Sequence, residues 1–292
     1  MKKSIISVLV LIVVLTLFSG CKGNENNLPI KETTNEATKP VIAVSIVPEG
    51  TFVKEVCGDL VEVVTLIPPG FSPENYEPTP KEMEKFSKAS IYFTIGVQSE
   101  VSILPKAGDL KIVHLEDEVS KVYKDITFES GERDPHIWLS PKRVKVMVDT
   151  IAKEMAELDE KNKDTYFANA DAYKEKLDFL DKEITDILKD VQNRKFIVFH
   201  PAFGYLADDY NLTMYSLEEE GKEATVRHLQ EMIDLAKREN IKAIFYQEEM
   251  DSSQSKAFAE EIGGKTIQLS PLAPNYVENL KNMVNLIAEV MK

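Results

Sequence analysis

The chain has 292 residues with 49 acidic and 35 basic side chains, which gives a formal net charge of −14. Such an acidic surface repels the phosphates of nucleic acids, so we exclude DNA and RNA as partners. The only two cysteines are Cys21 and Cys57, and the first lies in an export motif. An internal disulfide is therefore excluded, and Cys57 is predicted to be a small residue of the core.

The first 20 residues have the pattern of a bacterial signal peptide. Lys2 and Lys3 precede an uncharged apolar run at 5–18, which is shorter than the roughly 20 residues that a membrane-spanning helix needs. Small residues and then Cys21 follow the run. We therefore predict that residues 1–20 are removed, that Cys21 carries a lipid, and that the protein is extracytoplasmic and anchored to the cell membrane.

Residues 21–39 differ in composition from the rest of the chain. They are rich in Asn, Glu, Thr and Lys and contain almost no large apolar residue, which predicts a flexible tether behind the lipid. Cleavage before Cys21 removes two lysines and no acid, so the formal charge of the mature protein falls from −14 to −16. The roughly 250 residues after the tether suffice for two α/β lobes with buried cores.

Apolar runs typical of β-strands alternate with helical segments along the folded part. This alternation predicts parallel sheets. The runs divide into two sets of four, which predicts an N-terminal α/β lobe at 40–140 and a C-terminal α/β lobe at 194–292. The eight runs occupy residues 41–47, 61–67, 90–95 and 111–115, then 195–199, 212–217, 241–246 and 265–269.

Between the two lobes, residues 141–193 contain the longest helical pattern in the chain. Ser140 is a suitable N-cap, Pro141 occupies the first helical position, and no proline or glycine interrupts residues 142–192. A helix of about 25 residues spans nearly 40 Å, so this segment is predicted to be a long linking helix along the back of both lobes. The alternative is a pair of ordinary surface helices with charged outer faces.

Two of the four histidines begin loops on opposite sides of this helical segment. His136 lies in Asp-Pro-His-Ile-Trp-Leu-Ser-Pro, and His200 lies in Phe-His-Pro-Ala-Phe-Gly-Tyr-Leu. Imidazole is the commonest metal ligand, so the two positions predict a metal held between the lobes. The alternative is that each histidine is a turn residue whose nitrogens bond to the backbone.

Further polar residues follow the predicted strands. Ligands of open α/β sheets bind at the carboxyl ends of the strands, so these residues are expected to converge with His200. If the strand at 241–246 stays extended beyond its end, Gln247 and Glu249 share one face and Glu248 points away. The candidate contacts of this cleft are Asn75, Gln247, Glu249 and Ser270.

Five short motifs occur along the chain, each of them once. They are Pro-Pro-Gly at 68–70, Tyr-Glu-Pro-Thr-Pro at 76–80, Asp-Pro-His-Ile-Trp-Leu-Ser-Pro at 134–141, His-Pro-Ala-Phe-Gly-Tyr at 200–205 and Pro-Leu at 271–272. As a set they resemble the zinc/manganese-type (cluster 9) substrate-binding lipoproteins of bacterial ABC importers. The resemblance covers nearly the whole mature protein. It implies two parallel-sheet α/β lobes joined by one long backbone helix, with a metal in the cleft, and a monomer that delivers the metal to a membrane permease.

The resemblance also implies which residues bind the metal. His136 and His200 match ligand positions, whereas Asn75 stands where the family usually has a histidine. Ser270 stands where the family usually has an aspartate, and Gln247 replaces a common glutamate. Because neither an amide nor a hydroxyl replaces an imidazole or a carboxylate on zinc, we expect Glu249 to supply the negative ligand. Two histidines, this carboxylate and a water or amide oxygen satisfy a four-coordinate zinc, with manganese as the next choice.

The leading prediction is a binding protein that captures zinc or manganese as a transported ligand, not an enzyme. One alternative is the same fold with a cleft repurposed for a metal complex or another small ligand. A secreted metallohydrolase and a surface adhesin are further alternatives, since an open metal site and a tether are compatible with both. Against the hydrolase, the chain has no His-Glu-x-x-His pair and no Ser-His-Asp arrangement.

Overall fold

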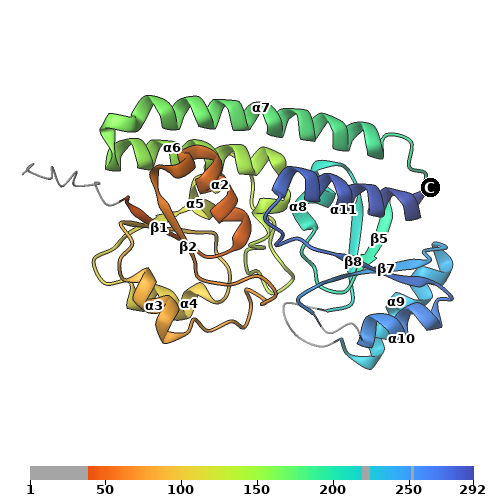
Figure 1. The fold of residues 1–292 in the computed structure, drawn as a ribbon. Helices are drawn as coiled ribbons and strands as arrows, with labels where there is room; N and C mark the ends of the chain where they lie inside the picture. Colours follow the sequence, from red (N-terminus) through yellow and green to blue (C-terminus); the bar gives the residue numbers. More distant parts are fainter. Residues whose placement is uncertain (1–38, 219–223, 251–252) are drawn as a thin grey trace, which may run out of the picture. The chain divides into compact units, whose positions relative to one another are not determined.

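The structure is a computed structural model that describes residues 39–218, 224–250 and 253–292 (Figure 1). The predicted signal peptide, Cys21 and nearly all of the predicted tether lie outside these residues. The helices and strands follow in the order β1 (Val41–Val44), α2 (Val47–Cys57), β2 (Glu62–Thr65), α3 (Pro80–Phe86), β3 (Ile91–Thr94), α4 (Glu100–Ile103), β4 (Lys111–His114), α5 (Leu115–Ser120), α6 (Pro141–Leu158), α7 (Lys163–Leu188), β5 (Lys195–Val198), α8 (Gly204–Asp209), β6 (Thr213–Ser216), α9 (Val226–Arg238), β7 (Ala243–Gln247), α10 (Ser253–Glu261), β8 (Lys265–Leu269) and α11 (Tyr276–Met291).

The four strands predicted in the N-terminal lobe form one parallel sheet in the order β2-β1-β3-β4. The central strands β1 and β3 are almost wholly buried, as expected for a parallel sheet whose faces are covered by helices. The chain passes from β1 to β2 on one side and then to β3 on the other. Loops that leave β1 and β3 therefore diverge, and a crevice opens at the carboxyl ends of these strands.

The C-terminal lobe repeats this topology with the strand order β6-β5-β7-β8, again all parallel. Its crevice lies at the carboxyl ends of β5 and β7. His200 follows β5 by two residues, and Gln247 is the last residue of β7. The two parallel-sheet lobes predicted from the alternation of strands and helices are confirmed, and His200 and Gln247 lie at the carboxyl ends of strands, where ligands bind in such sheets.

The predicted long helix is present as α7, and the shorter helix α6 precedes it in the linking segment. Helix α6 ends at Leu158, where Asp159 leaves the helical conformation with a φ of −137° and a ψ of 73°. The Asp159 carboxylate accepts hydrogen bonds from Asn162 Nδ2 at 2.6 Å and from Tyr166 OH at 2.9 Å. These local side-chain bonds stabilise a turn without proline or glycine, which is why the sequence pattern did not reveal the break.

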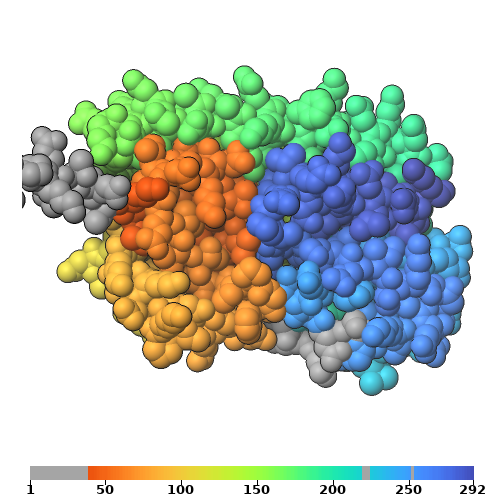
Figure 2. Space-filling model, viewed as in Figure 1, coloured from red at the N-terminus to blue at the C-terminus, as the bar shows by residue number. Residues whose placement is uncertain are grey.

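The long helix α7 leads the chain from the N-terminal lobe to the C-terminal lobe. It has 26 residues and is therefore about 39 Å long. It packs against α2 of the N-terminal lobe and against α11 of the C-terminal lobe, as Figure 1 shows. In the space-filling view of Figure 2, the side chains of α7 (green) lie along both lobes, whose surfaces meet along a seam below the helix.

One hydrophobic core runs through both lobes and the linking helices. It joins residues of β1 and β3 to the buried faces of α6 and α7 and to those of β5 and α11. Cys57 lies in this core with 1% of its surface exposed, as predicted, and burial raises the pKa of its thiol to about 12. Among the described residues, none of the helices combines the length and the apolar character that crossing a bilayer requires.

Polar bonds also join the lobes directly. Arg143 of α6 donates from Nη1 to Asp209 Oδ1 of α8 at 3.0 Å, and the Ser140 hydroxyl donates to the other oxygen of the same carboxylate. Trp138 donates from Nε1 to the carbonyl oxygen of Pro271 at 3.1 Å. Since Trp138 lies two residues after His136, this bond fixes the His136 loop against the C-terminal lobe.

Candidate metal centre

His136 lies at the start of a short helical turn that leads into α6, and it is 6% exposed. Asp134 Oδ1 accepts hydrogen bonds from the backbone N–H of His136 at 2.9 Å and from its Nδ1 at 2.7 Å. The Trp138 ring packs against the imidazole at a centroid distance of 5.0 Å. With Nδ1 bound to a carboxylate, the ring presents its Nε2 to the cleft.

Asp134 is itself fixed by the C-terminal lobe. It is 1% exposed, and its backbone carbonyl accepts a hydrogen bond from Tyr205 OH at 2.9 Å. A Cβ atom on Gly204 would lie 2.7 Å from Asp134 Oδ2, which is closer than a Cβ atom approaches a non-bonded oxygen in folded proteins. The glycine of the motif at 200–205 is therefore needed because the His136 loop packs directly on it.

His200 is 3% exposed and is held in the same way. Its Nδ1 donates to Glu218 Oε2 at 3.0 Å, so its Nε2 also points into the cleft. Glu218 follows β6 by two residues, which places it beside the end of β5 in the parallel sheet. Both histidines thus have Nδ1 on a buried carboxylate and Nε2 directed into the cleft.

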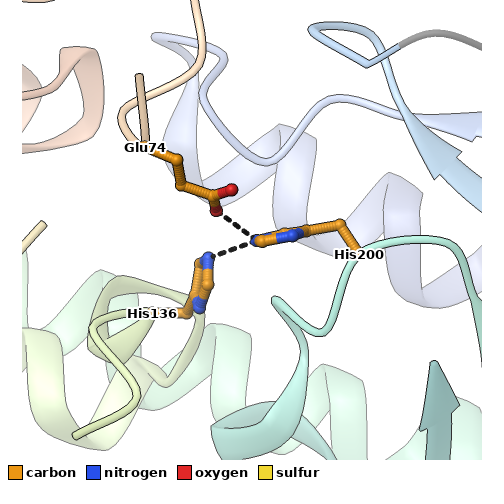
Figure 3. A group of neighbouring side chains, drawn as sticks. All are labelled: Glu74, His136 and His200. Atoms are coloured by element: carbon orange, nitrogen blue, oxygen red, sulfur yellow. Dashed lines mark hydrogen bonds and ion pairs between the residues drawn. The ribbon is translucent and has the colours of Figure 1, made fainter. Parts of the chain in front are cut away.

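Glu74 completes the group from the N-terminal lobe. It lies in the loop after β2, and this loop is anchored because Ser99 donates from its backbone N and its Oγ to the Pro73 carbonyl, at 3.0 and 2.6 Å. Glu74 Oε1 lies 2.6 Å from His200 Nε2, and this nitrogen lies 3.2 Å from His136 Nε2 (Figure 3). Burial raises the pKa of Glu74, but the hydrogen bond and charge of His200 outweigh this effect and lower it.

The three side chains have the chemistry and spacing of a zinc site. One carboxylate oxygen and two imidazole nitrogens lie within 4.8 Å of one another, and no other group of three such residues exists in the described part of the chain. Tetrahedral zinc with ligands at about 2.05 Å places neighbouring ligand atoms about 3.3 Å apart. The separation of 3.2 Å between the two Nε2 atoms matches this spacing, whereas the 2.6 Å between Glu74 Oε1 and His200 Nε2 is the shorter distance of a direct ion pair.

The structure places the other predicted residues differently. Asn75 and Gln247 line the cavity that contains the group, but Ser270 does not and instead donates to Glu248 Oε2 at 3.1 Å. Glu249 does not belong to the group, because the chain turns immediately after β7 and Met250 N donates to Gln247 O. The expectation that the strand continues past Gln247 was wrong, and the alternation that placed Glu249 in the cleft fails with it.

Gln247 has a feature that the sequence did not indicate. Its side chain is 6% exposed, and its Nε2 is buried without a hydrogen-bond partner among the described residues. A buried donor without an acceptor costs about 1–3 kcal/mol. Such groups are rare in folded proteins, and this one belongs to a residue that lines the cavity.

Three residues of the site were missed or undervalued by sequence reasoning. Glu74 directly precedes Asn75. Its carboxylate lies in a loop that follows a strand, and this position could have marked it as a candidate metal ligand. Asp134 stands two residues before His136 within the same motif, and a carboxylate near a ligating histidine is a recurring arrangement. Glu218 belongs to an acidic run whose later members lie outside the described residues.

The pH dependence of metal binding follows from His200. Burial lowers the pKa of His200, but hydrogen bonds to Glu218 and Glu74 outweigh it and raise the pKa to about 9. A metal ion that binds through His200 must therefore displace a proton, and its affinity is expected to fall about tenfold for each pH unit below about 9. Competitive zinc titrations between pH 6 and 9 measure this slope. An affinity that stays constant down to pH 6 contradicts the assignment of His200 as a ligand.

The free energy of unfolding of the metal-free protein depends on pH in the opposite direction to the metal affinity. Because the pKa of His200 is higher in the folded than in the unfolded chain, its protonation stabilises the fold fully below about pH 6.5. This contribution is lost as the pH rises through about 9. Urea unfolding of the metal-free protein at pH 6.5 and 9.5 separates this effect from metal binding.

Comparison with known proteins gives a consistent result. A family model described as the zinc-uptake complex component A, periplasmic (ZnuA), matches residues 42–290. The zinc-binding protein AdcA of Streptococcus pyogenes serotype M3 is 29% identical over 260 residues, which are 80% of this chain and 50% of AdcA. This chain therefore spans about half the length of AdcA. The high-affinity zinc uptake system protein ZnuA of Bacillus subtilis is 28% identical over 248 residues, which are 79% of this chain and 78% of that protein.

Solved structures agree with the sequence comparison. A crystal structure of ZnuA is 38% identical and superposes with a TM-score of 0.82 over 87% of this chain and 100% of its own. The predicted resemblance to metal-binding proteins of bacterial importers is thereby confirmed, as is the prediction of a binding protein rather than an enzyme. Since the family model matches well over half of the chain and the two-lobed fold is shared, the protein belongs to the ZnuA family of zinc-uptake components.

Proposed function

We propose that this protein captures a divalent metal outside the cytoplasm and delivers it to the permease of an ABC importer. The observation that supports this proposal is the meeting of Glu74, His136 and His200 between the lobes. A site shared by two lobes assembles only when both are in place, and it can be opened by a partner that contacts both. The protein is proposed to act as a monomer, because each of these ligands comes from the same chain.

Zinc is the proposed cargo, with manganese second. Two imidazoles and one carboxylate suit zinc, whereas manganese prefers a larger number of oxygen ligands. Protein purified without chelators should retain about one zinc per chain in metal analysis. In competition with a chromophoric chelator, zinc should bind more tightly than manganese. Retention of manganese in the presence of equal zinc would contradict the choice of metal, and retention of neither would contradict the function.

Lipid anchoring at Cys21 is proposed from the sequence of the export motif. Changing Cys21 to Ser should release the protein from the membrane fraction, because acyl chains attached to the cysteine are its only expected anchor. Fractionation followed by immunoblotting measures the change, and Lys22→Ala is a control that should remain in the membrane. Continued membrane association of the Cys21 variant after removal of the signal peptide would indicate another anchor.

A further inference from the structure

The cavity around the three candidate ligands is far larger than a metal ion. Its volume is about 680 Å³, and it extends from the metal group to residues of both lobes. Pockets of about 300–1,000 Å³ are typical of sites for small organic molecules. The lining includes four carboxamide side chains, which bind organic polar groups well but replace zinc ligands poorly; they are Asn75, Gln98, Gln247 and Gln254.

The candidate ligands also leave room in the coordination sphere. Zinc commonly takes four ligands, and the described residues bring together three, Glu74, His136 and His200. Ser270, which stands where the family usually has an aspartate, does not line the cavity. A ligand atom that arrives with the metal can occupy the remaining position.

The side chain of Gln247 indicates the chemistry of the molecule that supplies this ligand atom. It lines the cavity and holds a buried Nε2 without a partner among the described residues. An N–H donor repels a bare cation but bonds well to a carboxylate oxygen. The amide is therefore explained by an acceptor that enters the cavity together with the metal.

The charge of the cavity limits how many carboxylates the molecule that enters with the metal can carry. Its lining includes the carboxylates Glu74, Glu132 and Glu218, whereas its single guanidinium, Arg133, already pairs with Asp117 at 2.9 Å and Asp125 at 3.0 Å. A molecule with several carboxylates meets repulsion, and the described lining residues supply no unpaired guanidinium or ammonium group to offset it. A molecule with one carboxylate forms a zinc complex of net charge +1, which this cavity attracts.

We propose that the cleft takes zinc together with a small amino-acid-type chelator that carries one carboxylate. The chelator completes the coordination of the metal, its carboxylate accepts a hydrogen bond from Gln247, and the remaining cavity holds its body. Apolar side chains that can pack against this body include Val97, Phe128, Phe199 and Leu272. This inference rests on the proposed function, since it requires the metal to bind first.

The test uses zinc and radiolabelled L-histidine as the probe. Metal-free protein is mixed with zinc and histidine, passed through a desalting column, and assayed for both. We expect about one zinc and one histidine per chain, and no retained histidine when zinc is omitted. Labelled citrate in place of histidine should not be retained, because it carries three carboxylates.

Variants locate the companion in the cavity. Gln247→Leu and Gln247→Met remove the donor with side chains of similar length, and both should lower histidine retention at least tenfold. Zinc binding without histidine is measured for the same two variants. Gln268→Leu is the matched control, since this glutamine is exposed on β8 and does not line the cavity. It should retain histidine like the wild type.

The outcomes separate this inference from the proposed function. If zinc is retained without histidine, the inference of a bound chelator is wrong and the proposed capture of a metal stands. If both Gln247 variants weaken zinc binding in the absence of histidine, the amide oxygen is a metal ligand and the inference is overturned. Retention of citrate instead of histidine overturns the assigned class of chelator. If no zinc is retained at all, the proposed function fails together with the inference.

Discussion

Changing Glu74 to Gln is expected to weaken zinc binding about a hundredfold, equivalent to about 2.8 kcal/mol. The substitution keeps the size of the side chain but removes the only carboxylate of the three candidate ligands, and a neutral amide is a poor zinc ligand. The buried His200 also loses the anionic partner that its Nε2 contacts at 2.6 Å. Competitive titration with a chromophoric chelator measures the loss.

Two further variants make this test specific. Glu249→Gln should leave zinc affinity within about twofold, because Glu249 lies after the turn that ends β7 and outside the ligand group. His200→Ala should weaken binding at least tenfold, or about 1.4 kcal/mol. If instead Glu249→Gln weakens binding and Glu74→Gln does not, the ligand set inferred from the sequence is correct and the set drawn from the structure is wrong.

Changing Asp209 to Ala is expected to lower the free energy of unfolding by about 3–5 kcal/mol. The Asp209 carboxylate is 8% exposed and pairs with Arg143, whose side chain is 4% exposed. Removing it leaves the guanidinium buried without a counter-charge and also removes the acceptor of the Ser140 hydroxyl. Because these bonds join α6 to α8, they contribute to the stability of both lobes. Urea denaturation of the metal-free protein measures the change.

A second aspartate provides the control. Asp178 of α7 pairs with Lys145 of α6 at 2.5 Å, but its side chain is 62% exposed. Exposed ion pairs contribute little, so Asp178→Ala should change the free energy of unfolding by less than about 1 kcal/mol. Equal effects of the two substitutions would mean that the contact between α6 and α8 is not a buried ion pair in solution.

The fold was largely predictable because its sequence signals are local and repeated. Each strand is a short apolar run, and eight such runs separated by helical segments leave few arrangements other than two parallel sheets. The break between α6 and α7 was not predictable in this way. It depends on hydrogen bonds from Asn162 and Tyr166 to Asp159, and these side chains meet only once the turn has formed.

The site was predictable to the extent that its residues belong to motifs. His136 and His200 came from such motifs, and the structure places them together. Glu249 depended on extending a strand by two residues, and strand ends are where alternation stops being informative. In the loop with Pro73, alternation does not apply either, so the sequence did not reveal that Glu74 reaches the histidines.

The contact between the two imidazoles has a consequence for the empty receptor. With its pKa near 9, His200 carries a proton at neutral pH, and its Nε2 lies between Glu74 Oε1 and His136 Nε2. The proton therefore occupies the place of the metal and keeps the three side chains together by hydrogen bonds. In many small zinc domains the loss of metal unfolds the chain. Here the metal-free fold is held by the hydrophobic core that both lobes share, and the proton on His200 links the three side chains without an ion.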